Sequence, residues 1–201
     1  AGLDRTGLQD AMPPGAARNA LDCAYWDLEA KRSGVPAWRS AGLAAAPQPV
    51  LTAFTLSAAE PAAMQAAAER NASRPLLKIK LTGPGDLDRV RAVRAGAPGA
   101  RLIVDANEAW TADDYDVLAP QLAALGVELI EQPLTQHADG ALAGRARPVP
   151  LCADESCRDR ASLAGLAGRY DLVNIKLDKT GGLTLRAITV SKTTIERDCG
   201  G

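Results

Sequence analysis

Short apolar segments alternate with helical segments along most of the chain, and this alternation limits the possible fold more than any other feature of the sequence. From residue 50 onward, each unit of strand, turn and helix takes roughly 22–26 residues. Strands that alternate with helices favour parallel βαβ units, and strands rich in valine, isoleucine and leucine favour a sheet covered on both faces. The compact repeat favours a (β/α) barrel over a doubly wound sheet, although the period alone does not separate the two.

The expected elements follow one another in a regular order. We predict strands at residues 50–56, 76–81, 101–105, 127–131, 149–153 and 172–177. We predict helices at residues 17–32, 59–71, 86–95, 112–125, 138–144 and 159–168, with another after Gly182. The predicted fold class is therefore α/β, a partial barrel with about six of the eight strands that closure needs. Residues 1–47 are expected to form a helical lead-in, and residues 48–201 the incomplete barrel.

Charged residues interrupt the apolar pattern near the ends of five successive strands. They are Lys80, Asp105, Glu131, Asp154 and Lys176. One charge per unit at the same phase places all five at one edge of the sheet, and active sites form at the carboxyl ends of parallel strands. Taken singly, each could instead be a helix cap or a surface charge that follows its strand.

Three of these residues are acids, and carboxylates gathered in one place repel one another. A divalent cation removes that repulsion, and ligation by oxygen alone favours Mg²⁺ or Mn²⁺ over zinc. We therefore predict that Asp105, Glu131 and Asp154 bind one divalent cation, Mg²⁺ or Mn²⁺. The single histidine, His137, lies in a polar segment, so Ser-His-Asp and Cys-His catalysis are not expected.

The lysines are expected on the face of each strand that points into the barrel. Strand alternation places Lys78 and Lys80 on the same face, opposite the apolar residues of 76–81, and gives Lys176 the same setting in 172–177. Beside a second lysine and a cation, the pKa of such a lysine should fall toward the range of a general base. Edge-strand lysines that extend their charged ends into solvent are the alternative.

Together these groups describe one reaction. A cation held by three acids can bind a substrate carboxylate and stabilise the enediolate that forms when the α-proton leaves. Lysines on opposite sides of the substrate can remove the proton from one face and return a proton to the other. This chemistry is a two-base epimerisation.

Five short motifs carry the residues of this predicted site. They are Lys78-Ile-Lys80, Val104-Asp105-Ala-Asn107, Glu131-Gln-Pro133, Ala153-Asp154-Glu155-Ser156 and Asn174-Ile-Lys176-Leu-Asp-Lys179-Thr-Gly-Gly. In order and spacing they resemble the muconate-lactonizing branch of the enolase superfamily, and the resemblance covers about residues 15 to 186. The last motif is most similar to that of dipeptide epimerases of the L-Ala-D/L-Glu type.

The resemblance implies a Mg²⁺-dependent epimerase or racemase that acts on a small carboxylate, here a dipeptide. It implies the three acids as the Mg²⁺ ligands, Lys80 and Lys176 as the acid–base pair, and Lys78 as a group that binds the substrate carboxylate or tunes Lys80. Muconate cycloisomerase, N-acylamino-acid racemase and o-succinylbenzoate synthase activities use the same groups and are the alternatives within the superfamily. An inactive truncated fragment that acts at most as an interaction module is the alternative from another class.

The chain also departs from the family pattern. Only the end of the capping domain is expected here, two barrel strands are missing, and the tail from Leu185 does not resemble the family's alanine-rich helix. We therefore expect little or no epimerase activity from this chain alone. An open sheet has two unpaired edges, so pairing with another copy, as a homo-oligomer, is a further expectation.

The composition gives no reason to expect a nucleic acid or a membrane as partner. The net charge is -1, and no apolar run approaches the roughly 20 residues of a membrane span. No signal peptide is visible at the start, and the four cysteines show no C-x-x-C spacing. These features predict reduced thiols and a cytoplasmic location.

Overall fold

The computed structural model describes residues 2–184, so the tail from Leu185 lies outside the described residues. Two compact units make up this part of the chain. The first holds the residues up to Val50, residues 158–161 and the described residues from Ile175 onward, and the second holds Leu51–Cys157 and Ser162–Asn174. The predicted division into residues 1–47 and 48–201 stays a prediction.

The second unit is built on one parallel sheet. Its strands are β1 (Phe54–Leu56), β2 (Leu76–Lys80), β3 (Arg101–Asp105), β4 (Val127–Glu131), β5 (Leu151–Ala153) and β6 (Leu172–Val173). They pair in the order β1-β2-β3-β4-β5-β6, and every neighbouring pair is parallel. A doubly wound sheet reverses its strand order at a switch point, whereas a (β/α) barrel adds each strand beside the previous one. The predicted α/β class with six barrel-type strands is confirmed, and the sheet is not closed within the described residues.

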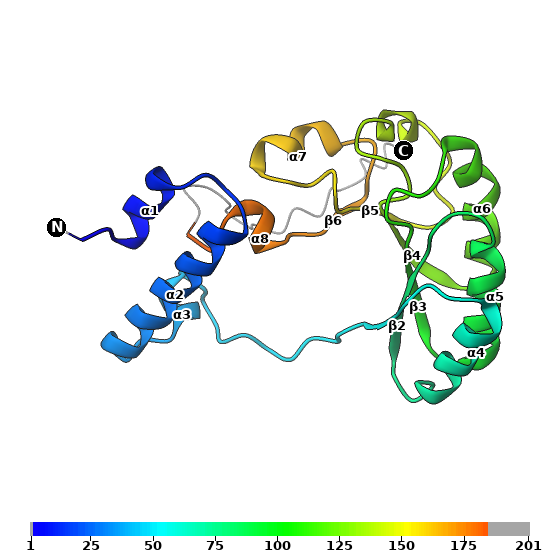
Figure 1. Cartoon of the computed structure of the whole chain (residues 1–201), viewed down its shortest axis with the longest axis horizontal. Helices are drawn as coiled ribbons and strands as arrows, with labels where there is room; N and C mark the ends of the chain where they lie inside the picture. The colour runs from blue at the N-terminus through cyan, green and yellow to red at the C-terminus, as the bar shows by residue number, and fades with distance from the viewer. Residues whose placement is uncertain (1, 185–201) are drawn as a thin grey trace. The chain divides into compact units, whose positions relative to one another are not determined.

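Helices connect the strands and cover one side of the sheet. In Figure 1, α4 (Pro61–Arg70), α5 (Asp86–Gly96) and α6 (Ala112–Ala124) lie along the same side of β2, β3 and β4. The 3₁₀ helix η1 (Asp139–Leu142) and helix α7 (Arg160–Leu166) follow; residues 160 and 161 of α7 are grouped with the first unit. No helix within residues 2–184 combines the length and the apolar character needed to cross a membrane.

Strand β2 shows how the sequence divides its side chains between two environments. Leu77 and Ile79 are completely buried in the hydrophobic core, while Lys78 and Lys80 on the other face are partly exposed. Successive residues of a strand point to opposite faces, so the lysines leave the helix-covered side. The predicted alternation is confirmed in this strand.

The predicted helix at residues 138–144 is wrong in type and length. The structure has only the 3₁₀ turn η1 there, followed by Gly144 in a left-handed conformation with φ 74°. A 3₁₀ turn rarely extends beyond three or four residues, and a glycine with positive φ favours termination of a helical segment.

The sixth predicted strand, 172–177, is also shorter than expected. Strand β6 ends at Val173, and Lys176 is the N-cap of a short helix, α8 (Leu177–Thr180). The amide of Asn174 still donates to the carbonyl of Ala153 at 2.7 Å, so the ladder continues for one residue and then stops. The alternation that placed Lys176 on a strand face therefore does not apply.

The first unit contains α1 (Arg5–Ala11), α2 (Ala16–Ser33), α3 (Ala37–Ser40) and α8. Helix α2 confirms the helix predicted at 17–32. Buried Arg18 on α2 donates to the carbonyl oxygens of Thr180 at 2.8 Å and Gly181 at 3.0 Å, which satisfies acceptors at the end of α8. Gly181 has φ 85°, and a Cβ there would lie 2.5 Å from Arg18 Nε, so this position needs glycine for both reasons.

Gly96 sets the distance between α4 and α5, and Gly96→Ala is expected to destabilise the second unit. An alanine normally favours a helix over glycine by about 1 kcal/mol. Here, however, the added Cβ would lie 2.5 Å from the backbone oxygen of Gln65 and 3.0 Å from Ala68 Cβ. We expect a net loss of about 1–3 kcal/mol in the free energy of unfolding, because overpacking forces backbone movement.

Urea denaturation of Gly96→Ala and of the control Gly99→Ala measures this effect. A Cβ at Gly99 meets nothing within 4 Å, so the control should leave the stability nearly unchanged. A Gly96→Ala protein as stable as the wild type would show that α4 and α5 separate without cost.

Candidate active site

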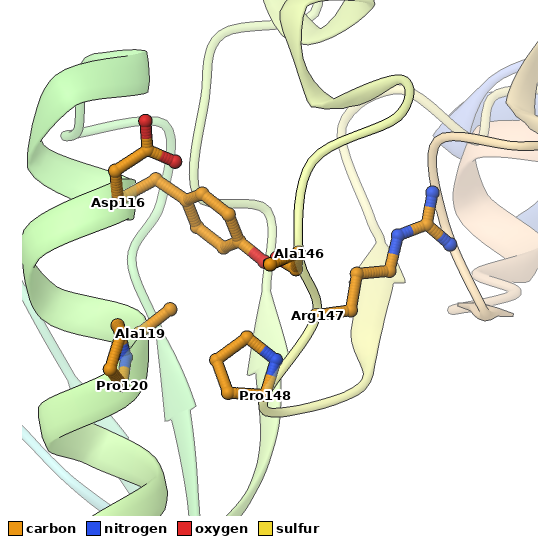
Figure 2. Close-up of a pocket in the computed structure, with 7 residues that line it drawn as sticks. Asp116, Ala119, Pro120, Ala146, Arg147 and Pro148 are labelled. Carbon is orange, nitrogen blue, oxygen red and sulfur yellow. The ribbon is translucent and has the colours of Figure 1, made fainter.

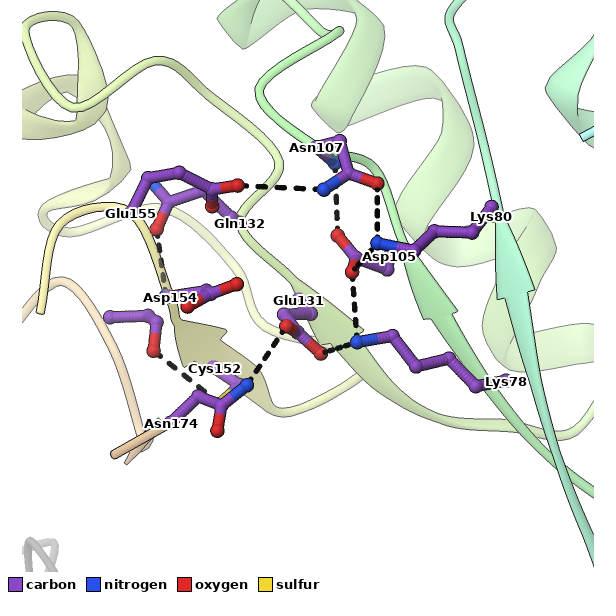
Figure 3. A network of polar contacts seen from close by, with 11 residues as sticks. Lys78, Lys80, Asp105, Asn107, Glu131, Gln132, Cys152, Asp154, Glu155 and Asn174 are labelled. Atoms are coloured by element: carbon purple, nitrogen blue, oxygen red, sulfur yellow. Dashed lines mark hydrogen bonds and ion pairs between the residues drawn. The ribbon is translucent and has the colours of Figure 1, made fainter. Parts of the chain in front are cut away.

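Three buried carboxylates meet at the carboxyl ends of adjacent strands. Asp105 ends β3, Glu131 ends β4, and Asp154 directly follows β5. One carboxylate oxygen from each lies within 4.8 Å of the others, and the three residues are 0%, 4% and 1% exposed. Strand register explains the proximity, since Asp105 pairs with Glu131 in the ladder. The structure therefore brings together the three acids that the sequence places at corresponding positions of successive strand–helix units (Figure 3).

Two lysines of β2 contact this cluster. Lys78 Nζ lies 2.8 Å from Asp105 Oδ2 and 2.6 Å from Glu131 Oε2. Lys80 Nζ lies 2.7 Å from Asp105 Oδ2 and donates to Asn107 Oδ1 at 3.0 Å. Both ammonium groups point from β2 toward the acids of β3 and β4, as Figure 3 shows. The cluster is thus a set of alternating positive and negative groups.

The pKa shifts in the cluster follow from burial and from these contacts. Burial alone would lower the pKa of Lys78, but hydrogen bonds to Asp105 and Glu131, with their charges, outweigh burial and raise it above the usual 10.5. Burial raises the pKa of Glu131, and the charge of Asp105 adds to this, while Lys78 and Asn174 oppose it. The fall in lysine pKa that the sequence predicts beside a bound cation is not seen for Lys78, whose pKa is raised; for the site with a cation bound it stays a prediction.

The donor set fits a hard divalent cation. Three carboxylates with two lysines leave an excess of one negative charge when these five groups alone are counted, and a cation among the acids would offset it. All the available ligand atoms are oxygens, as Mg²⁺ prefers. Nearby Glu155 Oε2 is buried and has no hydrogen-bond partner within residues 2–184, which marks a further unsatisfied anionic oxygen beside the acids.

Polar groups surround the acids and orient them. Asn174 Nδ2 donates to Glu131 Oε1 at 3.1 Å. Asn107 accepts from Lys80 and donates from Nδ2 to Glu155 Oε1 at 3.4 Å, so a chain of contacts runs from Lys80 to Glu155. Asn107 and Glu155 therefore lie beside the acids and lysines as supporting polar groups.

The predicted partner lysine, Lys176, belongs to the first unit, at the N-cap of α8. The carboxylates belong to the second unit. The role of Lys176 on the substrate face opposite Lys80 stays a prediction.

Sequence reasoning missed an unusual backbone conformation at this end of the sheet. Within residues 2–184, the non-glycine residues with positive φ are Asn107 (46°), Glu108 (64°) and Gln132 (35°), in the segments that follow β3 and β4. The amide of Glu108 donates to the carbonyl of Gln132 at 2.9 Å, which ties the two segments together. Backbone strain of this kind concentrates at functional sites. The only signal in the sequence was that each residue closely follows a predicted ligand.

A separate pocket contrasts with this cluster. It lies between α6 and the segment before β5, where Pro120 and Pro148 face each other and Tyr115 donates to the carbonyl of Ala146 at 2.9 Å (Figure 2). The segment enters β5 at its amino end, whereas Asp154 leaves the same strand at its carboxyl end. No predicted site residue lines the pocket.

Residues 62–189 match the family described as enolase C-terminal domain-like, which is more than half of the chain. The chain belongs to this family. Membership agrees with the in-order parallel strands and with acids at successive strand ends, and it confirms the resemblance found in the motifs.

Enolase-family relatives match almost the whole chain. An L-Ala-D/L-Glu epimerase from Escherichia coli (strain K12) is 48% identical over 185 residues, which cover 91% of this chain and 57% of that protein. An N-acetyl-D-glutamate racemase from a Pseudoalteromonas species is 46% identical over 190 residues, covering 94% of this chain and 60% of that protein. The chain therefore spans somewhat more than half the length of these curated relatives.

A solved member of the enolase family has the same architecture. It comes from Agrobacterium tumefaciens, is described as having homology to dipeptide epimerases, and holds sodium and L-Ala-L-Glu. It is 54% identical and superposes with a TM-score of 0.87, covering 91% of this chain and 56% of that one. The similarity in sequence and in structure supports the barrel-type fold of the described strands.

Proposed function

We propose that this chain carries the metal-binding and proton-transferring part of a Mg²⁺-dependent epimerase that inverts a carbon next to a carboxylate. The observation that carries the proposal is the group of three buried carboxylates within 4.8 Å of one another, with the ammonium groups of Lys78 and Lys80 against them. Asp105, Glu131 and Asp154 would hold the cation. When bound, the cation supplies positive charge that stabilises the negative charge developing on a substrate carboxylate.

The two lysines of β2 have different surroundings, which suits different roles. Lys80 keeps 36% of its side chain exposed, while Lys78 keeps 17% and contacts two acids. Lys80 is therefore the group that can reach a bound substrate and exchange a proton with it. Lys78 holds the acids in place and offers positive charge to the substrate carboxylate.

The proposed proton transfer uses two lysines, one that accepts a proton and one that donates a proton. In its neutral form, Lys80 Nζ takes the α-proton, and the electron pair of the broken C–H bond delocalises into the adjacent carboxylate. A proton from the ammonium group of Lys176 then forms a new C–H bond on the opposite face. In the reverse direction the lysines exchange roles, so the enzyme epimerises in both directions.

The substrate class proposed here is an N-acylated glutamate. The names of the relatives, L-Ala-D/L-Glu epimerase and N-acetyl-D-glutamate racemase, describe substrates with a glutamate whose amino group is part of an amide and whose α-carboxylate is free. The dipeptide is the first candidate, because a solved relative with 54% identity also holds L-Ala-L-Glu. N-acetylglutamate is the second candidate, supported by the 46% identical racemase.

A cytoplasmic location is part of the proposal. Cys23 and Cys152 are reduced thiols in the structure, and reduced thiols persist in a reducing compartment. Burial, together with the charges of Glu131 and Asp154, raises the pKa of Cys152 to about 12, so this thiol stays protonated and unreactive at neutral pH.

A chimera tests the proposed activity without depending on whether this chain is active alone. The matched part of this chain replaces the corresponding 57% of the Escherichia coli relative. With Mg²⁺ in deuterated water, L-Ala-L-Glu is expected to lose its glutamate α-proton signal in NMR and to yield L-Ala-D-Glu. Omission of Mg²⁺ and the Lys80→Met chimera serve as controls, and both should abolish the exchange.

Substrate choice is read from the same assay. Faster deuterium incorporation into N-acetylglutamate than into the dipeptide would favour racemase over epimerase activity. A folded chimera that binds the cation but exchanges neither α-proton would refute the proposed function. The isolated 201-residue chain, assayed in parallel, tests the expectation that it has little or no activity alone.

A further inference from the structure

Gln132 lies at the centre of a buried polar network that leads to one of the proposed metal ligands. It directly follows Glu131 at the end of β4, is completely buried, and has a left-handed backbone with φ 35°. Its own amide N–H donates to the carbonyl of Cys152 at 2.9 Å, which extends the pairing of β4 with β5. A glutamine adopts this conformation at a cost in free energy, so the surrounding contacts must stabilise it.

The oxygen of the Gln132 side chain holds the segment that carries Asp154. Oε1 accepts from the backbone N–H of Asp154 at 2.9 Å and from the backbone N–H of Ser156 at 3.1 Å. Two donors two residues apart on one acceptor fix the course of the backbone around Asp154. The direction in which the Asp154 carboxylate leaves the backbone is fixed with it.

The nitrogen of the same side chain faces three oxygens. Nε2 contacts the carbonyl of Leu134 at 2.8 Å, Ser156 Oγ at 2.8 Å and the Tyr170 hydroxyl at 2.9 Å. A flipped amide would place its NH₂ group against the two backbone N–H groups, which can only donate. The orientation of the amide is therefore determined by its neighbours.

The buried carboxylate of Asp139 fixes the direction of the hydrogen bonds that Ser156 and Tyr170 make. Asp139 Oδ2 accepts from Ser156 Oγ at 2.6 Å and from the Tyr170 hydroxyl at 3.2 Å. Asp139 Oδ1 accepts from Arg169 Nη1 at 2.6 Å. Since both hydroxyl hydrogens point to Asp139, the hydroxyl oxygens present lone pairs to Gln132 Nε2. The network is thus oriented from Arg169 to Asp154.

We propose that Gln132 is a positioning residue, which aims the Asp154 carboxylate and couples it to Glu131. This inference rests on the proposed function, since it assumes that Asp154 and Glu131 hold the cation. Gln132 is covalently next to one ligand and hydrogen-bonded to the backbone of the other, so it sets their separation. A glutamine with a purely structural role would need only hydrogen-bond partners of any kind. Here both hydrogen bonds that the side-chain oxygen accepts come from the backbone of the segment that carries Asp154.

Mn²⁺ binding to the complete 201-residue chain tests the proposal. The electron paramagnetic resonance signal of free Mn²⁺ is titrated with wild type, Gln132→Met and Ser156→Ala, and thermal melts establish that each is folded. Gln132→Met removes both backbone contacts and is expected to weaken Mn²⁺ binding by about 10–100-fold, as loss of a group that orients a ligand does. Ser156→Ala removes only the hydroxyl and keeps both backbone bonds, so its affinity should stay within about threefold.

Two further variants keep the test decisive. Gln65→Met on α4, where Nε2 contacts only Glu69 among the interactions described, controls for the substitution itself and should bind Mn²⁺ like the wild type. Gln132→Asn is one methylene shorter, so its amide cannot reach Asp154 and Tyr170 together. It replaces Gln132→Met if that variant does not fold, and the same loss is expected.

The outcomes separate this inference from the proposed function. A wild type that binds Mn²⁺, with a folded Gln132 variant that binds within twofold of it, overturns the positioning role and leaves the metal site intact. A role in folding alone would lower the melting temperatures of both Gln132→Met and Ser156→Ala and leave the affinity unchanged. A wild type that does not bind Mn²⁺ overturns the metal site and the inference together.

Discussion

Glu131→Gln is expected to weaken Mg²⁺ or Mn²⁺ binding by more than about 100-fold, beyond the 10–100-fold loss that follows removal of an outer orienting group. The substitution keeps the shape of the side chain but removes one of three negative charges from the cluster. The remaining amide oxygen is a weaker ligand for a hard cation. Lys78 also loses one of its two carboxylate partners. The positive charge of its ammonium group is then less compensated and repels a cation in the cluster more strongly.

The same strand offers a matched control for this substitution. Glu128 lies on β4 as well, but it is exposed and pairs with Arg101 at 2.6 Å. Glu128→Gln makes the same chemical change away from the cluster and should leave cation affinity unchanged. Isothermal titration with Mg²⁺ or the Mn²⁺ signal gives both affinities. Equal binding by Glu131→Gln and wild type would mean that the three acids do not hold the cation.

Lys78→Met is expected to cost about 3 kcal/mol in the free energy of unfolding when no divalent cation is present. Its ammonium group lies between Asp105 and Glu131, which are buried, and removal of one partner from a buried pair typically costs about 3–5 kcal/mol. The lower end applies because Lys80 still contacts Asp105. Urea denaturation in the presence of a chelator measures this loss.

Added Mg²⁺ should reverse much of the Lys78→Met defect, since the cation supplies the positive charge that the lysine provided. A cation that binds only the folded state stabilises that protein by about 2.7 kcal/mol at 100 times its dissociation constant. The gap to the wild type narrows because the variant has one positive charge fewer beside the acids and should bind the cation more tightly. Arg101→Met is the control, because it breaks only a solvent-exposed pair with Glu128, and such surface pairs contribute little to stability. If Lys78→Met were no more destabilising than Arg101→Met, the cluster would not depend on its lysine.

Several features of the fold followed from the order of residues alone. The alternation in Leu76–Lys80 predicted which side chains enter the core and which face the acids, and both are as expected. The regular spacing of acids at the ends of successive strands predicted that Asp105, Glu131 and Asp154 would meet, and they do. These predictions succeed because a strand has a period of two and parallel strands in register end at the same edge.

Other features needed the folded chain. The 3₁₀ turn at Asp139–Leu142 and the early end of β6 at Val173 replaced longer predicted elements, because local glycines and the next helical turn changed the backbone path. Gln132 carried no periodic signal, since its partners include Asp154 and Tyr170, which are 22 and 38 residues away. The order of residues along the chain therefore determined where the strands form and which acids they bring together. Only the tertiary structure decided how those acids are aimed, because hydrogen bonds between distant segments depend on backbone positions that no local pattern encodes.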